Sequence, residues 1–280
     1  MINILFYGNC QLYAVEKTLN LSPKKFKTFT IMCWLGEIDK NYFTDIIKTC
    51  DIIITQPIND NYRDVDYLST SYIINNAKQN CKIIIFDSCY FNFYYFDLTY
   101  KMFNDKMLNK PIDYHYYKMM ECYNDDLPIE HYIDNYANNI DFITSEELES
   151  IAENSLNELN NRSENTKNKY NSENIYVISI YRFVKNNYKK KLLFYSMNHP
   201  TKYLFHYICE KIAKILEIKN TIDYDIDVLA KDTKCILYKC IQKNVNFDIN
   251  DYLPLVLGKN NIYDITKLYY DTYKSIGFYN

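Results

Sequence analysis

Polar and reactive side chains follow the first apolar segment of the chain, where the sequence reads NILFYGNCQLY. Gly8 permits a tight turn, and Asn9, Cys10 and Gln11 follow it at once. Free N–H groups and the helix dipole would favour a thiolate at a cysteine that begins a helix. The amides of Asn9 and Gln11 could donate to a carbonyl oxygen that gains negative charge. The segment therefore predicts chemistry at a carbonyl group, or else an inert turn in which Asn9 is only a helix cap.

Two histidines lie in polar surroundings where a general base could act. His115 stands in PIDYHYY and His199 in SMNHPT. Imidazole is the usual base at neutral pH because its pKa is close by. Asn198 and Pro200 make His199 a rigid loop residue ahead of a helix, which is a poor place for a core histidine and a good one for a site. The other two histidines are interpreted as structural or surface residues: His131 and His206.

The elements that would position these side chains begin with a parallel sheet. Nearly continuous apolar segments predict strands buried on both faces, at residues 2–8, 28–34, 51–57 and 81–88. Helical spacing separates them, at residues 10–20, 39–49 and 65–79. The order is therefore βαβαβαβ, with right-handed crossovers.

Ligands of such a sheet bind outside the carboxyl ends of its strands, so the polar residues found there belong together. Thr55 and Gln56 end the third strand, and Asp87 and Ser88 end the fourth. Arg63 follows the third strand closely and is one of only three arginines in the chain. Weaker basic candidates stand later in the sequence: Arg182 and Lys185.

Beyond residue 90 the order of elements changes. A helix is expected from about residue 113, another over 144–160 after a Thr/Ser cap, a strand over 175–181 and an amphipathic helix after Pro200. The polar segment 160–174 is interpreted as an exposed helix end or a flexible excursion, and the last part as mainly helical. We predict one α/β domain over 1–280, a parallel β-sheet flanked by helices in an SGNH-like three-layer arrangement. Residues 1–215 form the motif-bearing core and 216–280 a helical C-terminal extension.

Composition excludes several classes of protein. The net charge is −3 and no basic block stands clear of acidic neighbours, so nucleic-acid binding is unsupported. The nine cysteines are scattered and odd in number, which indicates a reducing compartment and disfavours a zinc site. No apolar segment reaches the roughly 18 residues of a membrane span, and no signal peptide is recognisable. We expect a soluble, cytoplasmic protein. Tyrosine, asparagine, isoleucine and lysine are abundant and only three of the 32 basic residues are arginine, which indicates A/T-rich codons. Such codons fit a parasite, a bacterium or a large DNA virus; a viral protein would lie in the host cytoplasm.

The motifs YGNCQ, TQPI, PIDYH and NHP occur in this order and resemble the WcbI family of capsular polysaccharide biosynthesis acetyltransferases. The resemblance covers roughly residues 1–215, and GNCQ is its most specific element. It implies an α/β enzyme that uses acetyl-CoA as co-substrate, without a metal, to acetylate a sugar, nucleotide-sugar or glycan. The sequence departs from the family pattern at Ile112 and Tyr116, which concerns the acceptor pocket more than the chemistry.

The resemblance and the residues together give the expected site. The expected catalytic residues are Cys10, His199 and His115. Residues expected to contact the substrate or its oxyanion are Asn9, Gln11, Gln56, Asp113 and Asn198. Residues expected to bind coenzyme A are Gly8, Arg63 and Ser88, with the arginine fork suited to a phosphate.

Two routes and two rival functions stay open. Cys10 could take the acetyl group as a thioester, or a histidine could deprotonate the acceptor for direct attack on acetyl-CoA, which we prefer slightly. The first rival is an SGNH-type carbohydrate esterase, although Cys10 replaces its serine and no DxxH surrounds His199. The second is a non-catalytic carbohydrate- or partner-binding domain. The sequence does not identify the sugar, does not tell whether an oxygen or a nitrogen of it is acetylated, and does not tell whether the chain forms a homo-oligomer.

Overall fold

The structure is a computed structural model that describes residues 1–219 and 221–279. The chain forms two compact units, each assembled from separate segments. Unit 1 comprises Met1–Cys89, Asn157–Lys185 and Pro200–Val228. Unit 2 comprises Tyr90–Leu156, Asn186–His199 and Leu229–Asn280. The single domain expected over 1–280 stays a prediction.

Unit 1 contains a five-stranded parallel sheet flanked by helices, which confirms the predicted fold class. In spatial order its strands are β2 (Phe26–Met32), β1 (Ile2–Gly8), β3 (Ile52–Thr55), β4 (Lys82–Phe86) and β9 (Ile175–Ile178). The register places Leu5 opposite Phe29 on one side and opposite Ile53 on the other. The predicted strands are correct in type, and their bounds differ by a few residues.

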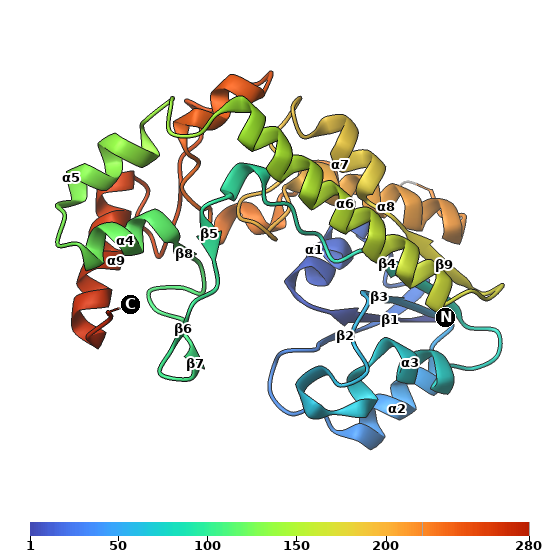
Figure 1. The fold of residues 1–280 in the computed structure, drawn as a ribbon. Helices are drawn as coiled ribbons and strands as arrows, with labels where there is room; N and C mark the ends of the chain where they lie inside the picture. Colours follow the sequence, from blue (N-terminus) through green and yellow to red (C-terminus); the bar gives the residue numbers. More distant parts are fainter. Residues whose placement is uncertain (220, 280) are drawn as a thin grey trace. The chain divides into compact units, whose positions relative to one another are not determined.

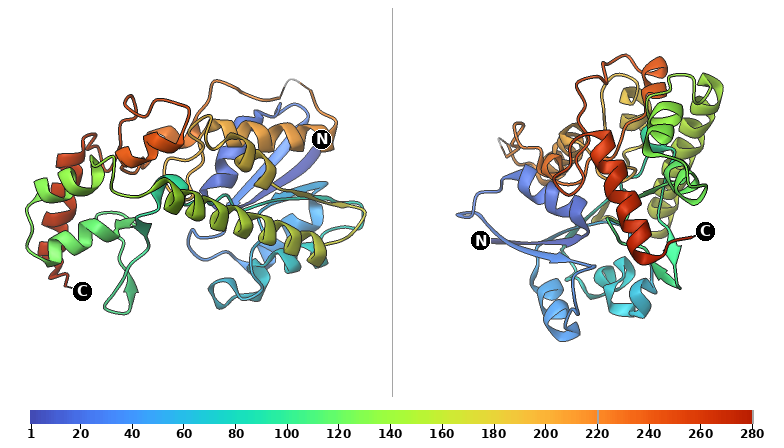
Figure 2. Two further views of the ribbon diagram at one scale, coloured as in Figure 1. Left: turned by 45° about the horizontal axis from the view of Figure 1, so that its top comes forward. Right: turned by 90° about the vertical axis from the view of Figure 1, so that its left-hand side faces the viewer.

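Helices cover both faces of this sheet (Figure 1, Figure 2). Helix α1 (Cys10–Leu19) packs against α8 (Lys202–Leu216), and Cys209 Sγ donates to Val15 O at 3.6 Å. The opposite face carries α2 (Lys40–Thr49) and α3 (Thr70–Asn76), which pack against each other. Two short 3₁₀ turns precede α3, at Tyr62–Asp64 and Asp66–Leu68.

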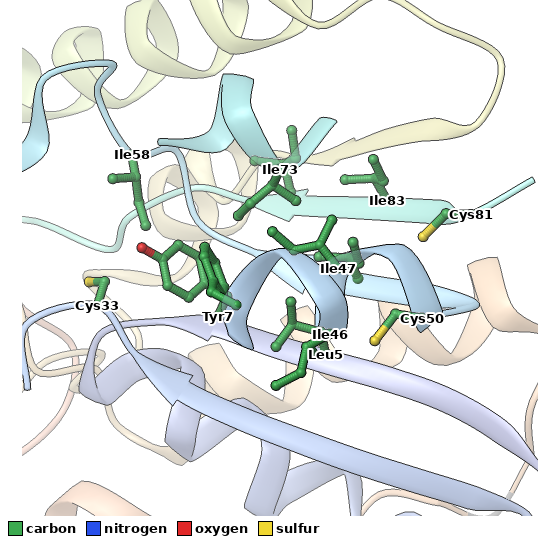
Figure 3. Close-up of a cluster of buried hydrophobic side chains, with 13 residues drawn as sticks. Leu5, Tyr7, Cys33, Ile46, Ile47, Cys50, Ile58, Ile73, Cys81 and Ile83 are labelled. Atoms are coloured by element: carbon green, nitrogen blue, oxygen red, sulfur yellow. The ribbon is translucent and has the colours of Figure 1, made fainter. Parts of the chain in front are cut away.

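The core beneath α2 and α3 is built from alternate strand residues (Figure 3). Leu5 and Tyr7 of β1 lie in this cluster with Ile46 and Ile47 of α2 and Ile73 of α3. Ile4 and Phe6, which alternate with them in β1, are also fully buried. Because successive side chains of a strand point to opposite faces, β1 is buried on both, as its continuous apolar sequence predicts.

The strand order places a topological switch point between β1 and β3. From β1 the chain moves outward to β2 and then returns across β1 to β3, so the connections after β1 and β3 run in opposite directions. In open parallel sheets ligands bind at this switch point, outside the carboxyl ends of the strands. The residues that follow β1 and β3 are Gly8–Gln11 and Gln56 onward, the segments with candidate chemistry.

Unit 2 is built from short strands and helices. Two antiparallel pairs join β5 (Leu98–Thr99) with β8 (His115–Tyr116), and β6 (Met102–Phe103) with β7 (Lys106–Met107). Its helices include α4 (Tyr117–Asn124), α5 (Ile129–Tyr132), the π-turn η4 (Ile133–Ala137) and α9 (Ile262–Ile276). Its 3₁₀ turns include η3 (Phe93–Tyr95) and η6 (Lys239–Asn244). The helix expected from about residue 113 begins at Tyr117, after a short strand that the sequence does not announce.

Three helical elements run from one unit's segments into the other's: α6 (Ser145–Lys169), α7 (Tyr181–Asn187) and η5 (Val228–Lys231). Helix α6 begins with the predicted cap, since Thr144 Oγ1 accepts the Glu147 N–H at 3.2 Å while Glu147 Oε2 accepts the Thr144 N–H at 2.9 Å. The helix continues well past residue 160. The polar segment after that residue is therefore mostly helix, with Ser163 and Thr166 buried.

The core of unit 2 is rich in tyrosine. Tyr116, Tyr132, Tyr238 and Tyr269 are each at most 2% exposed, and their rings contact one another at centroid distances of 5.7–6.5 Å. Each buried phenol needs a polar partner: Tyr238 Oη, for example, donates to Asp97 Oδ2 at 2.6 Å. The tyrosines here are packing residues.

No helix in residues 1–219 or 221–279 combines the length and apolar character that crossing a membrane requires.

Candidate functional site

Residues Gly8–Gln11, here called the Cys10 junction, connect β1 to α1. Asn9 caps the helix, because its Oδ1 accepts the Gln11 N–H at 2.9 Å. Cys10 is the first helical residue, and the first turn carries no acidic side chain. The N-terminal N–H groups and dipole of this ten-residue helix therefore favour negative charge at the Cys10 sulfur.

Cys10 differs from the other cysteines in its accessibility. All nine cysteines lie in the described part of the chain, and eight of them are buried while Cys10 is half-buried. The neighbouring Cys89 shows the contrast, because burial raises its pKa well above the usual value and keeps it a thiol. Reactive cysteines are partly exposed and often lie at a helix N-terminus, and Cys10 has both features.

Two glutamine amides tie the Cys10 junction to the loops after β3 and β4. Gln56 Oε1 accepts the Asn9 N–H at 3.0 Å, and Gln56 Nε2 donates to Gln11 Oε1 at 2.8 Å. Gln11 Nε2 donates to Cys89 O at 2.9 Å, and Gln11 Oε1 accepts the Cys89 N–H at 2.9 Å. Both glutamines are 2% exposed. The structure thus brings Asn9, Gln11 and Gln56 together, and the two glutamines bond to the loops that support Cys10.

Gly8 has no room for a side chain, and this gives a testable expectation. A Cβ there would lie 2.7 Å from Gln56 Oε1 and 3.3 Å from Leu12 Cβ. We expect Gly8→Ala to lower the free energy of unfolding by about 1–3 kcal/mol, because Gln56 must move and Asn9 loses its acceptor. Urea denaturation followed by circular dichroism measures the loss.

The double variant Gly8→Ala/Gln56→Ala is the control for this clash. Truncating Gln56 removes the oxygen that the new methyl group would meet. The double variant should therefore lose less stability than the sum of the two single losses. Strictly additive losses would show that the two residues do not interact.

Arg63 lies in the loop after β3, where it supports backbone. Its Nη1 donates to Gly36 O at 2.8 Å and to Cys33 O at 3.3 Å, and so holds the loop that follows β2. Ser88 is half-buried and lines a cavity in unit 1. The assignment of both residues to coenzyme A stays a prediction.

That cavity has a volume of about 470 Å³ and lies wholly within unit 1. Its walls are the loop residues Pro57–Asn59 and Asp87–Ser88 and one side of α6 from Leu159 to Lys169, with Tyr170 beyond. The α6 wall was not predicted from the sequence. The sequence signal for this wall was Arg162, one of only three arginines in the chain. Thr166 and Lys169 follow it by four and seven residues, which places all three on one face of a helix.

His199 lies in unit 2 with Tyr114 and Asn198. The rings of His199 and Tyr114 meet edge to face at 5.7 Å, and Tyr114 Oη donates to Asn198 Oδ1 at 2.5 Å. Asn198 Nδ2 donates to Tyr100 Oη at 2.9 Å. Burial lowers the pKa of His199, and the charges of Asp232 and Asp113 oppose this only in part. The imidazole is therefore neutral near pH 7 and able to accept a proton.

His115 lies in a different environment in the same unit. It is fully buried, its Nδ1 is 2.7 Å from Tyr273 Oη, and its Nε2 is 3.0 Å from Leu108 O. Leu108 O can only accept, so Nε2 carries the proton and Nδ1 accepts from the tyrosine. Burial lowers the pKa of His115. Because both ring nitrogens are bonded, His115 is placed to hold β8 and α9 together. Asp113, two residues before it, is exposed.

Within residues 1–219 and 221–279, no group of three or more His, Cys, Asp or Glu side chains is arranged to hold a metal ion.

The sequence profile of the family described as polysaccharide biosynthesis enzyme WcbI matches residues 3–221. The chain belongs to the WcbI family. The match includes all the candidate site residues and confirms the resemblance drawn from the four motifs. None of the curated proteins matches the sequence.

A solved WcbI structure, described as that of a novel polysaccharide biosynthesis enzyme, has the same fold. It aligns with a TM-score of 0.82 at 20% identity, over 98% of this chain and 90% of that one. It is described as the native protein without a disulfide bond between coenzyme A and one of its cysteines. The WcbI fold therefore extends past the family match, through the C-terminal segment that carries none of the four motifs.

Proposed function

We propose that this chain is an acyltransferase that moves an acetyl group from acetyl-CoA to a sugar or nucleotide-sugar in glycan biosynthesis. The observation that supports it is the Cys10 junction: a half-buried thiol at a helix N-terminus, beside the switch point of a parallel sheet. The solved WcbI structure is described as the native protein without a disulfide bond between coenzyme A and one of its cysteines. Such a bond requires the two sulfurs to meet, and Cys10 is the accessible cysteine here.

The Cys10 junction suits a thioester. Its helix N-terminal N–H groups can stabilise a carbonyl oxygen that becomes negative during acyl transfer. Gln11 and Gln56 keep the junction in place through their bonds to Asn9 and Cys89. Their proposed contribution is to position the Cys10 junction rather than to donate to the oxyanion.

The proposed base is His199. It takes the proton of the acceptor hydroxyl, the acceptor oxygen bonds to the acyl carbon, and the bond from that carbon to sulfur breaks. The proton then passes to the departing thiolate, so atoms and charge balance. A neutral imidazole can do this, and burial keeps His199 neutral. His115 is proposed as a positioning residue because both of its ring nitrogens are bonded.

Calorimetric titration with coenzyme A and acetyl-CoA tests the proposal. We expect both to bind the wild type with dissociation constants of about 1 μM to 1 mM, as enzymes bind their substrates. Absence of binding to either would refute the proposal.

A Cys10→Ala variant then separates the two routes. Direct attack predicts that turnover stays within about tenfold of the wild type, since Cys10 only helps to position the thioester. A covalent route predicts loss of turnover with retained coenzyme A binding, because the atom that forms the intermediate is gone.

We also propose a cytoplasmic location. The nine cysteines, all within the described residues, form no disulfide. Thiols persist in this form in reducing compartments.

A further inference from the structure

Unit 2 contains a cavity that the proposed acetyl transfer does not use. Its volume is about 300 Å³, and all of its described lining residues belong to the segments of unit 2. They come from three stretches near the end of the chain, 236–239, 249–254 and 260–262, together with Asn138. This volume lies at the lower end of the range of small-ligand sites. The lining side chains show which ligand the cavity suits.

Tyr252 presents an aromatic ring of fixed orientation to this cavity. Its hydroxyl donates to Cys235 O at 2.7 Å and lies 3.0 Å from Tyr95 Oη. Burial of this phenol raises its pKa well above the usual value. The polar end of Tyr252 is therefore bonded inside the protein, and the ring is the part that can face a ligand. A held ring offers a flat apolar surface without loss of side-chain freedom on binding.

Asparagine amides supply polar groups around this ring. Asn138, Asn250 and Asn260 line the cavity, and each amide carries two N–H donors and a carbonyl acceptor. Leu253, which is 60% exposed, and Pro254 add apolar surface beside them. A sugar ring has an apolar C–H face and a rim of hydroxyls that donate and accept. An aromatic face among amides matches both parts of it.

The charge of the cavity limits the ligand further. Lys239, exposed at the start of η6, is the only charged side chain among the described residues that line it. A single ammonium group pairs well with one carboxylate, such as that of an acidic sugar. The phosphates of a nucleotide carry several negative charges, which one lysine does not balance. The lining therefore favours a glycan over a nucleotide.

The cavity wall is bonded to the segment that holds His199. Leu255, which follows the wall residue Pro254, donates its N–H to Lys234 O at 2.7 Å and accepts the Lys234 N–H at 2.8 Å. The backbone of Thr233, one residue earlier, forms a hydrogen bond with the His199 imidazole. One short segment therefore supports both the wall and the proposed base.

We propose that this cavity binds a segment of a glycan chain, with a sugar ring against Tyr252 and an acidic sugar at Lys239. The inference goes beyond the proposed acetyl transfer, because the cavity lies in unit 2, apart from the Cys10 junction, and binding there needs no coenzyme A. The family is described as polysaccharide biosynthesis enzymes, which act on such chains. A site of this kind selects the acceptor by the chain around the reacting sugar.

The test is a glycan array of neutral and uronic-acid oligosaccharides, probed with the labelled full-length chain. Asn250→Trp fills the cavity from an exposed position of its wall. Asn246→Trp is the matched control, because it makes the same change at an exposed position of the same segment that does not line the cavity. We expect the wild type and Asn246→Trp to bind uronic-acid oligosaccharides and Asn250→Trp to bind them about tenfold more weakly, a loss of about 1.4 kcal/mol. Thermal melting confirms that both variants fold.

A second pair of variants tests the charge. Lys239→Gln should remove the preference for uronic-acid over neutral oligosaccharides. Lys259→Gln makes the same change at an exposed position outside the lining and should keep the preference. If no oligosaccharide binds, or if Asn250→Trp binds like Asn246→Trp, the cavity is not a glycan site. That result leaves the acetyl-transfer proposal standing, since the titration with coenzyme A tests it separately.

Discussion

The His199→Ala variant is expected to transfer acetyl groups about 10²–10⁴-fold more slowly than the wild type, with coenzyme A binding unchanged. The reason is that burial lowers the pKa of His199, so that the residue is a neutral base near pH 7. Removing it leaves the acceptor hydroxyl without a proton acceptor. Chromatographic measurement of coenzyme A released from acetyl-CoA, with a panel of sugars and nucleotide-sugars as acceptors, gives the rate.

The matched control is His131→Ala, a half-buried histidine of α5 in the same unit. Its turnover should stay within twofold of the wild type. The pH profile adds a second readout: the wild-type rate should fall on the acid side, below the lowered pKa of His199, and the variant should lack this limb. Equal rates for the two alanine variants, or an acid limb retained in His199→Ala, would remove His199 from the mechanism.

The sheet of unit 1 could be predicted because its strands are recognisable locally. Ile52–Thr55 and Lys82–Phe86 are continuous apolar segments, and such segments are typical of strands buried on both faces. Gly8 also marked the turn that follows β1, because glycine permits a tight turn. The clash of a Cβ there with Gln56 is a contact between distant residues that only the fold shows. The alternation with helices predicted a parallel sheet with right-handed crossovers, but not the spatial order of its strands.

The division into two units could not be predicted, because it depends on contacts between distant segments. Unit 2 joins residues 90–156 with 186–199 and with the last 52 residues, from Leu229 to Asn280. Each of these segments reads locally as an ordinary mixture of turns and helices. The end of α6 was uncertain for another reason. Its buried residues there are Ser163 and Thr166, and hydroxyl side chains give no hydrophobic periodicity.

The members of the Cys10 junction were predictable, but the contributions of their side chains were not. Residue type and strand ends sufficed to place Gln11 and Gln56 near Cys10. That the two amides bond to each other and to Cys89 depends on the sheet register, which brings positions 11, 56 and 89 together. His115 illustrates the converse, since its polar sequence context suggested a base. Its partner Tyr273 lies 158 residues further along the chain, and only the fold shows that the imidazole is buried.

The second large effect is expected in the pH dependence of stability, through Asp97. This carboxyl is 7% exposed, and burial raises its pKa to about 7, although the Tyr238 hydroxyl and the Lys118 N–H donate to it. In the unfolded chain its pKa is about 3.9. Between these values the folded state holds a proton that the unfolded state has lost. The free energy of unfolding therefore falls as pH rises through this window, by about 4 kcal/mol for a shift of roughly three pKa units.

The variant Asp97→Asn isolates this effect, because an amide does not titrate. The difference in the free energy of unfolding between wild type and variant, measured by urea denaturation at pH 4 and at pH 8, should change by about 4 kcal/mol in favour of the variant at the higher pH. Asp87, whose pKa burial raises to about 6, acts in the same direction in unit 1 and is present in both proteins, so it cancels in the comparison. A difference that stays constant between the two pH values would mean that Asp97 is already ionised in the folded protein. The Tyr238 hydroxyl would then have to stabilise a buried carboxylate, as a charge-assisted hydrogen bond can.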